Sequence, residues 1–296
     1  MNGDFSKNKD ILNAPFLYKG FSRWPSFSPD GTKIVFTMHA DVTECFIGII
    51  DISNPSNIVQ LTLPKMEAKR PTWHPDGSKI AYNVNNETIW EYDISSGVSK
   101  LYLPEEVRKS VNFIHPWYSP DGNSILVASF NRNGPQREEV LYRLNSQSEN
   151  PIQQLTQYPH VCAGRNTSNP VNQDIIFAGH AGYFNQLENR LWKVKPPQKA
   201  YSLEKGDSAN CHGRCPAYSP FGDWVACVSC RPIRKPTIDT PQSVWIIRSD
   251  GSEAYKLTDG SFLPTHMSWS PDQKKLAVTG ASGLQLIDLP EMFLSK

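Results

Sequence analysis

Histidine and arginine recur at the first position of a repeated motif, and these residue types are well suited to binding an anion. The motif reads WPSFSPDG from Trp24, RPTWHPDG from Arg70, HPWYSPDG from His115, CPAYSPFG from Cys215 and HMSWSPDQ from His266. Its architecture is retained while the first residue changes. Arginine holds carboxylate, sulfate or phosphate through paired hydrogen bonds, and histidine titrates near neutral pH. The variable position is therefore the candidate chemical site.

The proline that follows sets the register of the repeat. It stands at residues 29, 75, 120, 220 and 271, with spacings of 46, 45, 100 and 51. The interval of 100 residues contains a degenerate copy, SNPVNQDIIF, which places Pro170 in register. Six units of this length are typical of a repeating β architecture.

Each unit is expected to contain four short strands, which in the first unit span about 25–28, 33–38, 45–52 and 58–63. Pro-Asp-Gly closes the first pair, since proline sets φ and glycine accepts a positive φ. The sequence predicts an all-β fold, a six-bladed β-propeller of four-stranded antiparallel blades. The blades are expected near residues 20–64, 65–104, 110–157, 160–204, 210–259 and 262–290.

Closure of the ring is expected from the N-terminal segment. The last repeat leaves room for three strands, and DILNAPF matches the segments that precede other repeats. Residues 10–18 are therefore predicted to complete the sixth blade, which removes exposed sheet edges. The whole chain, residues 1–296, is predicted to be one domain.

Radial stacking gathers the residue five before each proline at one mouth of the central channel, together with the loops between second and third strands. We therefore predict a cationic mouth that binds a small anionic ligand; the alternative is that these side chains bond loop carbonyls or face water. The predicted ligand-binding residues are Trp24, Arg70, His115, Arg132, Arg165, Tyr183, Asn185, Arg214 and His266.

The P-x-aromatic-S-P-D-G pattern resembles the TolB-type propeller repeats, and the resemblance covers nearly the whole chain. A shorter stretch, FAGHAGYFNQLENRLWKV from Phe177, is similar to the oligogalacturonate lyases at His180, Gly182, Arg190, Leu191 and Trp192. The second resemblance implies β-elimination from a uronate oligosaccharide. It implies His180 as the base and Arg165 as the carboxylate clamp. The alternative is that His180 caps a strand end.

The lyases also use a histidine-rich metal site, which implies a divalent cation, manganese or zinc. The candidate ligands are His115, His212 and His266. The expected His-x-His-Pro element reads Pro264-Thr265-His266-Met267 here, so one ligand of that element is missing.

Cysteines cluster in the fifth repeat at positions 211, 215, 227 and 230. Three arrangements are open: reduced thiols, a Cys215–Cys230 disulfide, or a zinc site that includes His212. The aromatic residues of the motif are expected to pack between blades, and its aspartates to form turns. His74, in place of the usual serine, is expected to be solvated.

The net charge of +1, with both signs scattered, predicts neither nucleic acid nor a membrane as partner. The N-terminus lacks the apolar run of a signal peptide, so a cytoplasmic location is expected, or a periplasmic or secreted one if a signal was removed. Two functions remain open. One is an acidic-saccharide binder that also cleaves its ligand as a lyase, and the other is a non-catalytic scaffold for a protein or peptide.

Overall fold

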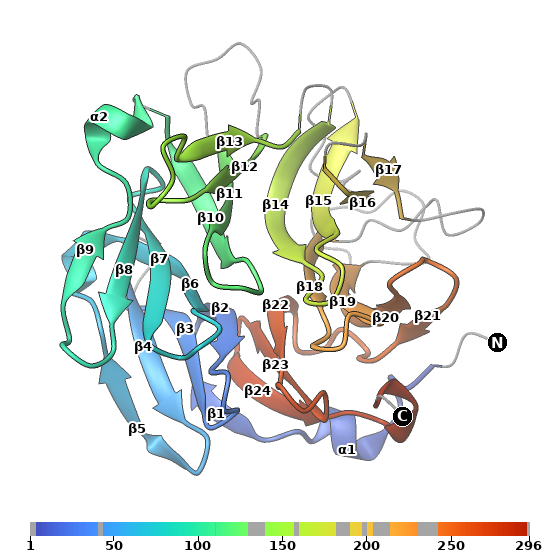
Figure 1. Cartoon of the computed structure of the whole chain (residues 1–296). Helices are drawn as coiled ribbons and strands as arrows, with labels where there is room; N and C mark the ends of the chain where they lie inside the picture. The colour runs from blue at the N-terminus through green and yellow to red at the C-terminus, as the bar shows by residue number, and fades with distance from the viewer. Residues whose placement is uncertain are drawn as a thin grey trace.

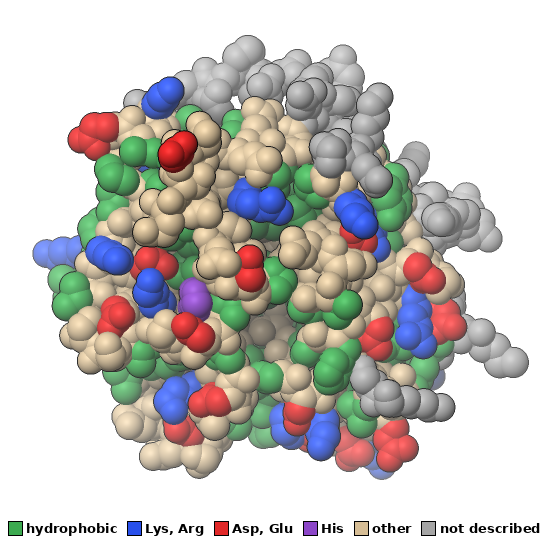
Figure 2. Space-filling view, in the orientation of Figure 1, with side chains coloured by type: hydrophobic (Ala, Val, Ile, Leu, Met, Phe, Trp, Pro, Cys, Tyr) green, Lys and Arg blue, Asp and Glu red, His purple; other side chains and the backbone are tan. Residues whose placement is uncertain are grey.

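The computed structural model forms six four-stranded antiparallel sheets around a common axis (Figure 1). It describes residues 4–40, 44–109, 111–129, 140–156, 160–181, 190–196, 200–203, 214–229 and 242–294. The predicted six-bladed propeller is confirmed. Face-on, the ring is hollowed at its centre, and charges of both signs are scattered over the outer part of that face (Figure 2).

Each blade runs from an inner strand at the channel to an outer strand at the rim. Blades 1 to 3 comprise β2 Ser22–Phe27, β3 Lys33–His39, β4 Cys45–Asp51 and β5 Asn54–Gln60; β6 Ala68–Trp73, β7 Lys79–Val84, β8 Thr88–Asp93 and β9 Ser99–Leu101; and β10 Phe113–Tyr118, β11 Ile125–Ser129, β12 Leu141–Leu144 and β13 Ile152–Gln154. Blades 4 to 6 comprise β14 His160–Ser168, β15 Ile175–Ala181, β16 Arg190–Val194 and β17 Tyr201–Ser202; β18 Arg214–Tyr218, β19 Trp224–Ser229, β20 Ser243–Arg248 and β21 Ala254–Lys256; and β22 Pro264–Trp269, β23 Lys275–Gly280, β24 Gly283–Asp288 and β1 Phe16–Lys19. Short helices occur at α1 Lys9–Leu12, η1 Pro64–Met66, α2 Glu105–Arg108 and η4 Glu291–Phe293.

The inner hairpin of each blade depends on the motif turn, as blade 1 illustrates. The Ser28 hydroxyl donates to Asp30 Oδ1 at 2.6 Å, and the Thr32 amide donates to the same oxygen at 2.9 Å. Gly31 occupies the left-handed region, with φ of 73°. The hydrogen bond from Ser28, together with those from Thr32, lowers the pKa of Asp30 to about 2. The motif aspartates are turn formers, as predicted.

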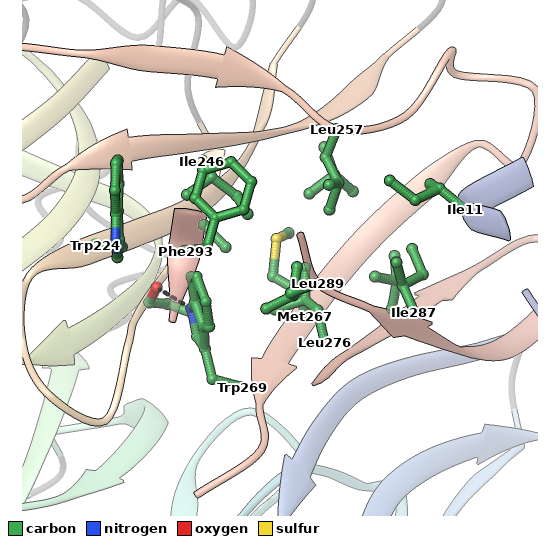
Figure 3. Packing of buried hydrophobic residues seen from close by; sticks show 14 of the residues in the cluster. Ile11, Trp224, Ile246, Leu257, Met267, Trp269, Leu276, Ile287, Leu289 and Phe293 are labelled. Atoms are coloured by element: carbon green, nitrogen blue, oxygen red, sulfur yellow. Dashed lines mark hydrogen bonds between the residues drawn. The ribbon is translucent and has the colours of Figure 1, made fainter. Parts of the chain in front are cut away.

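The ring closes through the N-terminal segment. β1 pairs with β24 and supplies the outer strand of blade 6, so the predicted closure is confirmed, with the strand starting at Phe16 rather than residue 10. The preceding residues form α1 because the Asn8 side chain caps the first turn by accepting from the Asp10 amide. Both termini lie beside blades 5 and 6 (Figure 1). There Ile11 and Phe293 join a buried cluster with Trp224, Leu257 and Ile287 (Figure 3).

The motif aromatics are buried between blades, as predicted: Phe27, Trp73, Tyr118, Tyr218 and Trp269. His74 differs from its predicted solvated state. Its Nδ1 lies 2.6 Å from Asp76 Oδ1 and its Nε2 lies 3.2 Å from the Gly122 carbonyl oxygen, so it bridges blades 2 and 3. Asn169 does the same for blades 4 and 5, where its amide donates to the Gly222 carbonyl at 2.9 Å. The serines at this position instead bond within their own turns.

Candidate functional site

Six residues stand five positions before a motif proline, and four of them have a left-handed backbone. Trp24, Arg70, His115 and Cys215 have φ of 52°, 59°, 57° and 52°, and each directly precedes a proline. The pairing of the inner strand with the second strand shifts register here in all four blades. Such bulges re-aim side chains, and a non-glycine residue in this conformation costs about 1–3 kcal/mol. Four positions of the predicted site therefore carry backbone strain.

The indole of Trp24 brings residues of three blades together. Its centroid lies 4.8 Å from that of the His266 imidazole in blade 6, and 4.8 Å from Arg70 Cζ in blade 2. Trp24 and His266 are only 6% and 7% exposed. Trp24 therefore serves as a platform that holds two ionisable groups, and little of its ring remains for a ligand to stack on.

Neutral groups position the Arg70 guanidinium. One of its terminal nitrogens donates to Asn83 Oδ1 at 2.8 Å and to Asn86 Oδ1 at 2.6 Å. Asn83 is fully buried, and its amide nitrogen donates to the carbonyls of Thr88 and Phe113 at 3.1 and 2.9 Å. These two bonds fix the amide orientation and present its oxygen to Arg70. An amide oxygen holds the guanidinium in place without neutralising it.

Arg23 is a mouth residue that the sequence did not predict. Its Cζ lies 4.8 Å from the centroid of Phe21 and 5.5 Å from that of Trp24. Burial lowers the pKa of Arg23, and the charge of Cys215 acts in the opposite direction. Within the described ranges no carboxylate forms an ion pair with Arg23, and its Nε is buried without a hydrogen-bond partner.

Strand alternation explains why Arg23 was missed. Neighbouring residues of a regular strand face opposite sides of the sheet, so Arg23 and Trp24 were not expected at one site. The bulge at Trp24 removes that alternation and both side chains reach the mouth. Only the residue order Arg-Trp-Pro, a basic residue before a bulged X-Pro pair, could have indicated it.

His39, at the end of β3, adds a neutral aromatic wall. Its ring lies 4.6 Å from that of Phe21. Burial, assisted by the positive charges of Arg23 and Lys69, lowers the pKa of His39 to about 4. Next to Arg23 this imidazole is therefore uncharged at neutral pH.

The other predicted residues are placed only in part. His115, Arg214 and Cys215 are partly buried at the inner strands β10 and β18. Arg165 and His180 belong to β14 and β15, and their backbones are described while their side chains are not. Four predicted residues lie outside the described residues: Arg132, Tyr183, Asn185 and His212.

The predicted metal ligands are not assembled in the part of the chain that the structure describes. That part contains no group of three His, Cys, Asp or Glu side chains with metal-binding geometry, and His212 lies outside it. Of the cysteine cluster in the fifth repeat, Cys215 and Cys227 are described, whereas Cys211 and Cys230 lie outside the described residues, so the three cysteine arrangements remain open. The described helices also include none with the length and apolar character needed to span a membrane.

The fold resembles that of several solved propellers. The chain superposes on a putative TolB from Agrobacterium tumefaciens with a TM-score of 0.62 at 18% identity, covering 95% of this chain and 93% of that one. For TolB from Acinetobacter baumannii the TM-score is 0.60 at 16% identity, and the 90% of this chain that aligns spans only 56% of that protein.

The oligogalacturonate lyase from Vibrio parahaemolyticus aligns with a TM-score of 0.59 at 12% identity, over 95% of this chain and 91% of that one. No family model matches the sequence, and a search of curated proteins finds no relative. At these identities the similarity concerns the fold. The chain is thus a six-bladed β-propeller whose fold resembles those of TolB and oligogalacturonate lyase.

Proposed function

We propose that the channel mouth binds the carboxylate of a small acidic saccharide, a uronate oligosaccharide. The observation that carries this proposal is Arg23, a partly buried guanidinium with no carboxylate partner among the described residues. Removing a cation from water without a counter-ion is costly, and a bound anion offsets that cost. Arg70, held by amide oxygens 2.8 and 2.6 Å away, supplies a second guanidinium over the Trp24 ring.

Cleavage of the bound saccharide by β-elimination extends this proposal. In that reaction a base removes the proton next to the uronate carboxylate, the electron pair forms the double bond, and the glycosidic oxygen leaves. His180 is the candidate base and Arg165 the candidate clamp, because β14 and β15 pair next to each other in blade 4. A bound manganese or zinc ion, with His115, His212 and His266 as candidate ligands, would stabilise the negative charge that develops on the carboxylate.

The test combines binding and turnover. Digalacturonate should bind in calorimetry, whereas its neutral methyl ester should not, and Arg23→Gln should weaken binding by about tenfold or more. Equal binding of acid and ester would overturn the proposal. Oligogalacturonates, with and without manganese, should yield the ultraviolet absorbance of an unsaturated product. Binding without that absorbance would reject only the elimination.

A scaffold function is the alternative, and two exposed apolar residues favour it. At the turn position where other blades carry aspartate, adjacent blades 4 and 5 carry Val171 and Phe221, which are 72% and 49% exposed. Val171→Asp with Phe221→Asp restores the residue that the other turns use, so the fold should be kept. If these turns contact a protein or peptide, pull-down with the wild-type propeller should recover a partner that the double variant loses.

A further inference from the structure

A cavity of about 400 Å³ lies at the end of the channel away from the arginines. The motif proline of every blade lines it, because each inner strand runs from the mouth residue to its turn within about five residues. This volume lies within the range of small-molecule sites. The six prolines are Pro29, Pro75, Pro120, Pro170, Pro220 and Pro271.

The walls of this cavity carry no Asp, Glu, Lys or Arg side chain among the described residues. Behind the prolines stand six aromatic residues: Phe27, Trp73, Trp117, Tyr118, Tyr218 and Trp269. The lining contains one imidazole, His74, whose two nitrogens already face Asp76 and the Gly122 carbonyl. A charged ligand would lose its hydration here and gain no counter-ion, so the walls select a neutral one.

Buried hydroxyls supply polarity to the walls, and those of Ser26 and Ser268 have a hydrogen to donate. Ser26 Oγ accepts from the Trp73 amide at 3.4 Å and Ser268 Oγ accepts from the Phe27 amide at 3.2 Å, which leaves both hydroxyl hydrogens for another acceptor. Both serines line the cavity and are 5% and 6% exposed. Each hydroxyl can therefore donate its hydrogen to an acceptor on a ligand in the cavity.

We propose that this cavity binds a small, neutral aromatic molecule that carries a hydrogen-bond acceptor such as a carbonyl. Proline and aromatic side chains contact its ring, and the serine hydroxyls donate to its acceptor. This site is separate from the channel mouth, and its ligand differs in charge from the anion proposed there.

Two probes of nearly equal shape separate the sites. 2-Acetylnaphthalene is neutral and has a carbonyl, whereas 2-naphthoate replaces the methyl ketone with a carboxylate. Calorimetry should show that acetylnaphthalene binds the wild-type protein and that Arg23→Gln leaves its affinity unchanged. Absence of binding, or loss of binding in Arg23→Gln, would overturn this site. The affinity for 2-naphthoate should decrease in Arg23→Gln. An unchanged affinity for naphthoate would contradict only the anion site proposed at the channel mouth.

A matched pair of variants locates the probe. Pro170 is exposed at the cavity rim, and both Pro170→Trp and Pro170→Ala remove the proline, but only tryptophan fills the opening. Pro170→Trp should weaken acetylnaphthalene binding about tenfold or more, with Pro170→Ala near wild type. If Pro170→Trp does not fold, Pro29→Trp in the opposite blade repeats the test. Equal affinity for the folded Trp and Ala variants would show that the probe binds elsewhere.

Discussion

Trp117 and Ser168 both lie at the interface of blades 3 and 4, where the large and the small residue of the repeat are exchanged relative to the other interfaces. At the other interfaces, one blade contributes a small residue, three positions before its motif proline. The next blade contributes an aromatic residue, two positions before its own proline, as Ser26 of blade 1 and Trp73 of blade 2 illustrate. Here blade 4 has Ser168 at the aromatic position, and Trp117 of blade 3 packs into the cluster that fills this interface. Both residues line the neutral cavity. The two departures from the repeat thus compensate for each other.

This compensation predicts strong coupling. Trp117→Ser should cost about 1–3 kcal/mol through the lost packing of a partly buried ring, and Ser168→Trp about 1–3 kcal/mol through overpacking. The double variant restores the arrangement of the other interfaces, so its loss of stability should be smaller than the sum by at least about 1 kcal/mol. Urea unfolding of the four proteins measures this difference. Additive losses would show that the two side chains do not share one space.

Backbone strain at Arg70 should be separable from its charge. Its φ of 59° favours glycine. The free energy of unfolding, measured in urea, should therefore be larger for Arg70→Gly than for Arg70→Ala by about 1 kcal/mol. Both variants should lose the acidic ligand equally. At the neighbouring strand residue Lys69, whose φ is not positive, the order should reverse, with alanine more stable than glycine. The same order at both positions would contradict strain at the mouth.

Cys215 offers a built-in reporter of charge at the mouth. The charges of Arg23 and the Cys215 thiolate interact, so the guanidinium should attract an anionic reagent to Cys215. The ratio of the alkylation rates with iodoacetate and with neutral iodoacetamide should therefore be higher at Cys215 than for a free thiol. Arg23→Gln should reduce this preference for the anion about threefold or more. Peptide mapping by mass spectrometry gives both rates at this one residue, and Cys215→Ser is the blank. An unchanged ratio in Arg23→Gln would remove Arg23 from the anion site.

Stability should depend on pH through His39. Its pKa is lowered to about 4 in the folded protein from the ordinary value of 6.5, so between these values the unfolded chain binds more protons. Stability is thus fully present above about pH 6.5 and falls as the pH drops toward about 4. His39→Phe keeps a ring against Phe21 and should flatten this slope in urea midpoints. The turn aspartates Asp30 and Asp76, with pKa values of about 2, affect both proteins alike, and only below that window.

The fold was predictable because its information is local and repeated. Pro-Asp-Gly sets the inner turn, as the Ser28–Asp30 hydrogen bond of 2.6 Å shows, and the spacing of the prolines gives the number of blades. The number of strands in the last repeat predicted closure by the N-terminal segment, and β1 confirms it, although the strand starts at Phe16 rather than at residue 10. The same repeat placed Trp24, Arg70 and His266 at one mouth.

Other features depend on three-dimensional packing and were not predicted. Arg23 reaches the mouth only because a bulge interrupts the alternation of β2, and His74 is bridged only because the Gly122 turn of the next blade lies against it. The neutral cavity exists because six prolines, each one a local turn signal, meet around one axis. The periodicity of the sequence determines which side chains of a strand share a face and how many blades the repeat forms. The distances between side chains from different blades, and hence the charge or neutrality of the space they enclose, arise only when the ring closes.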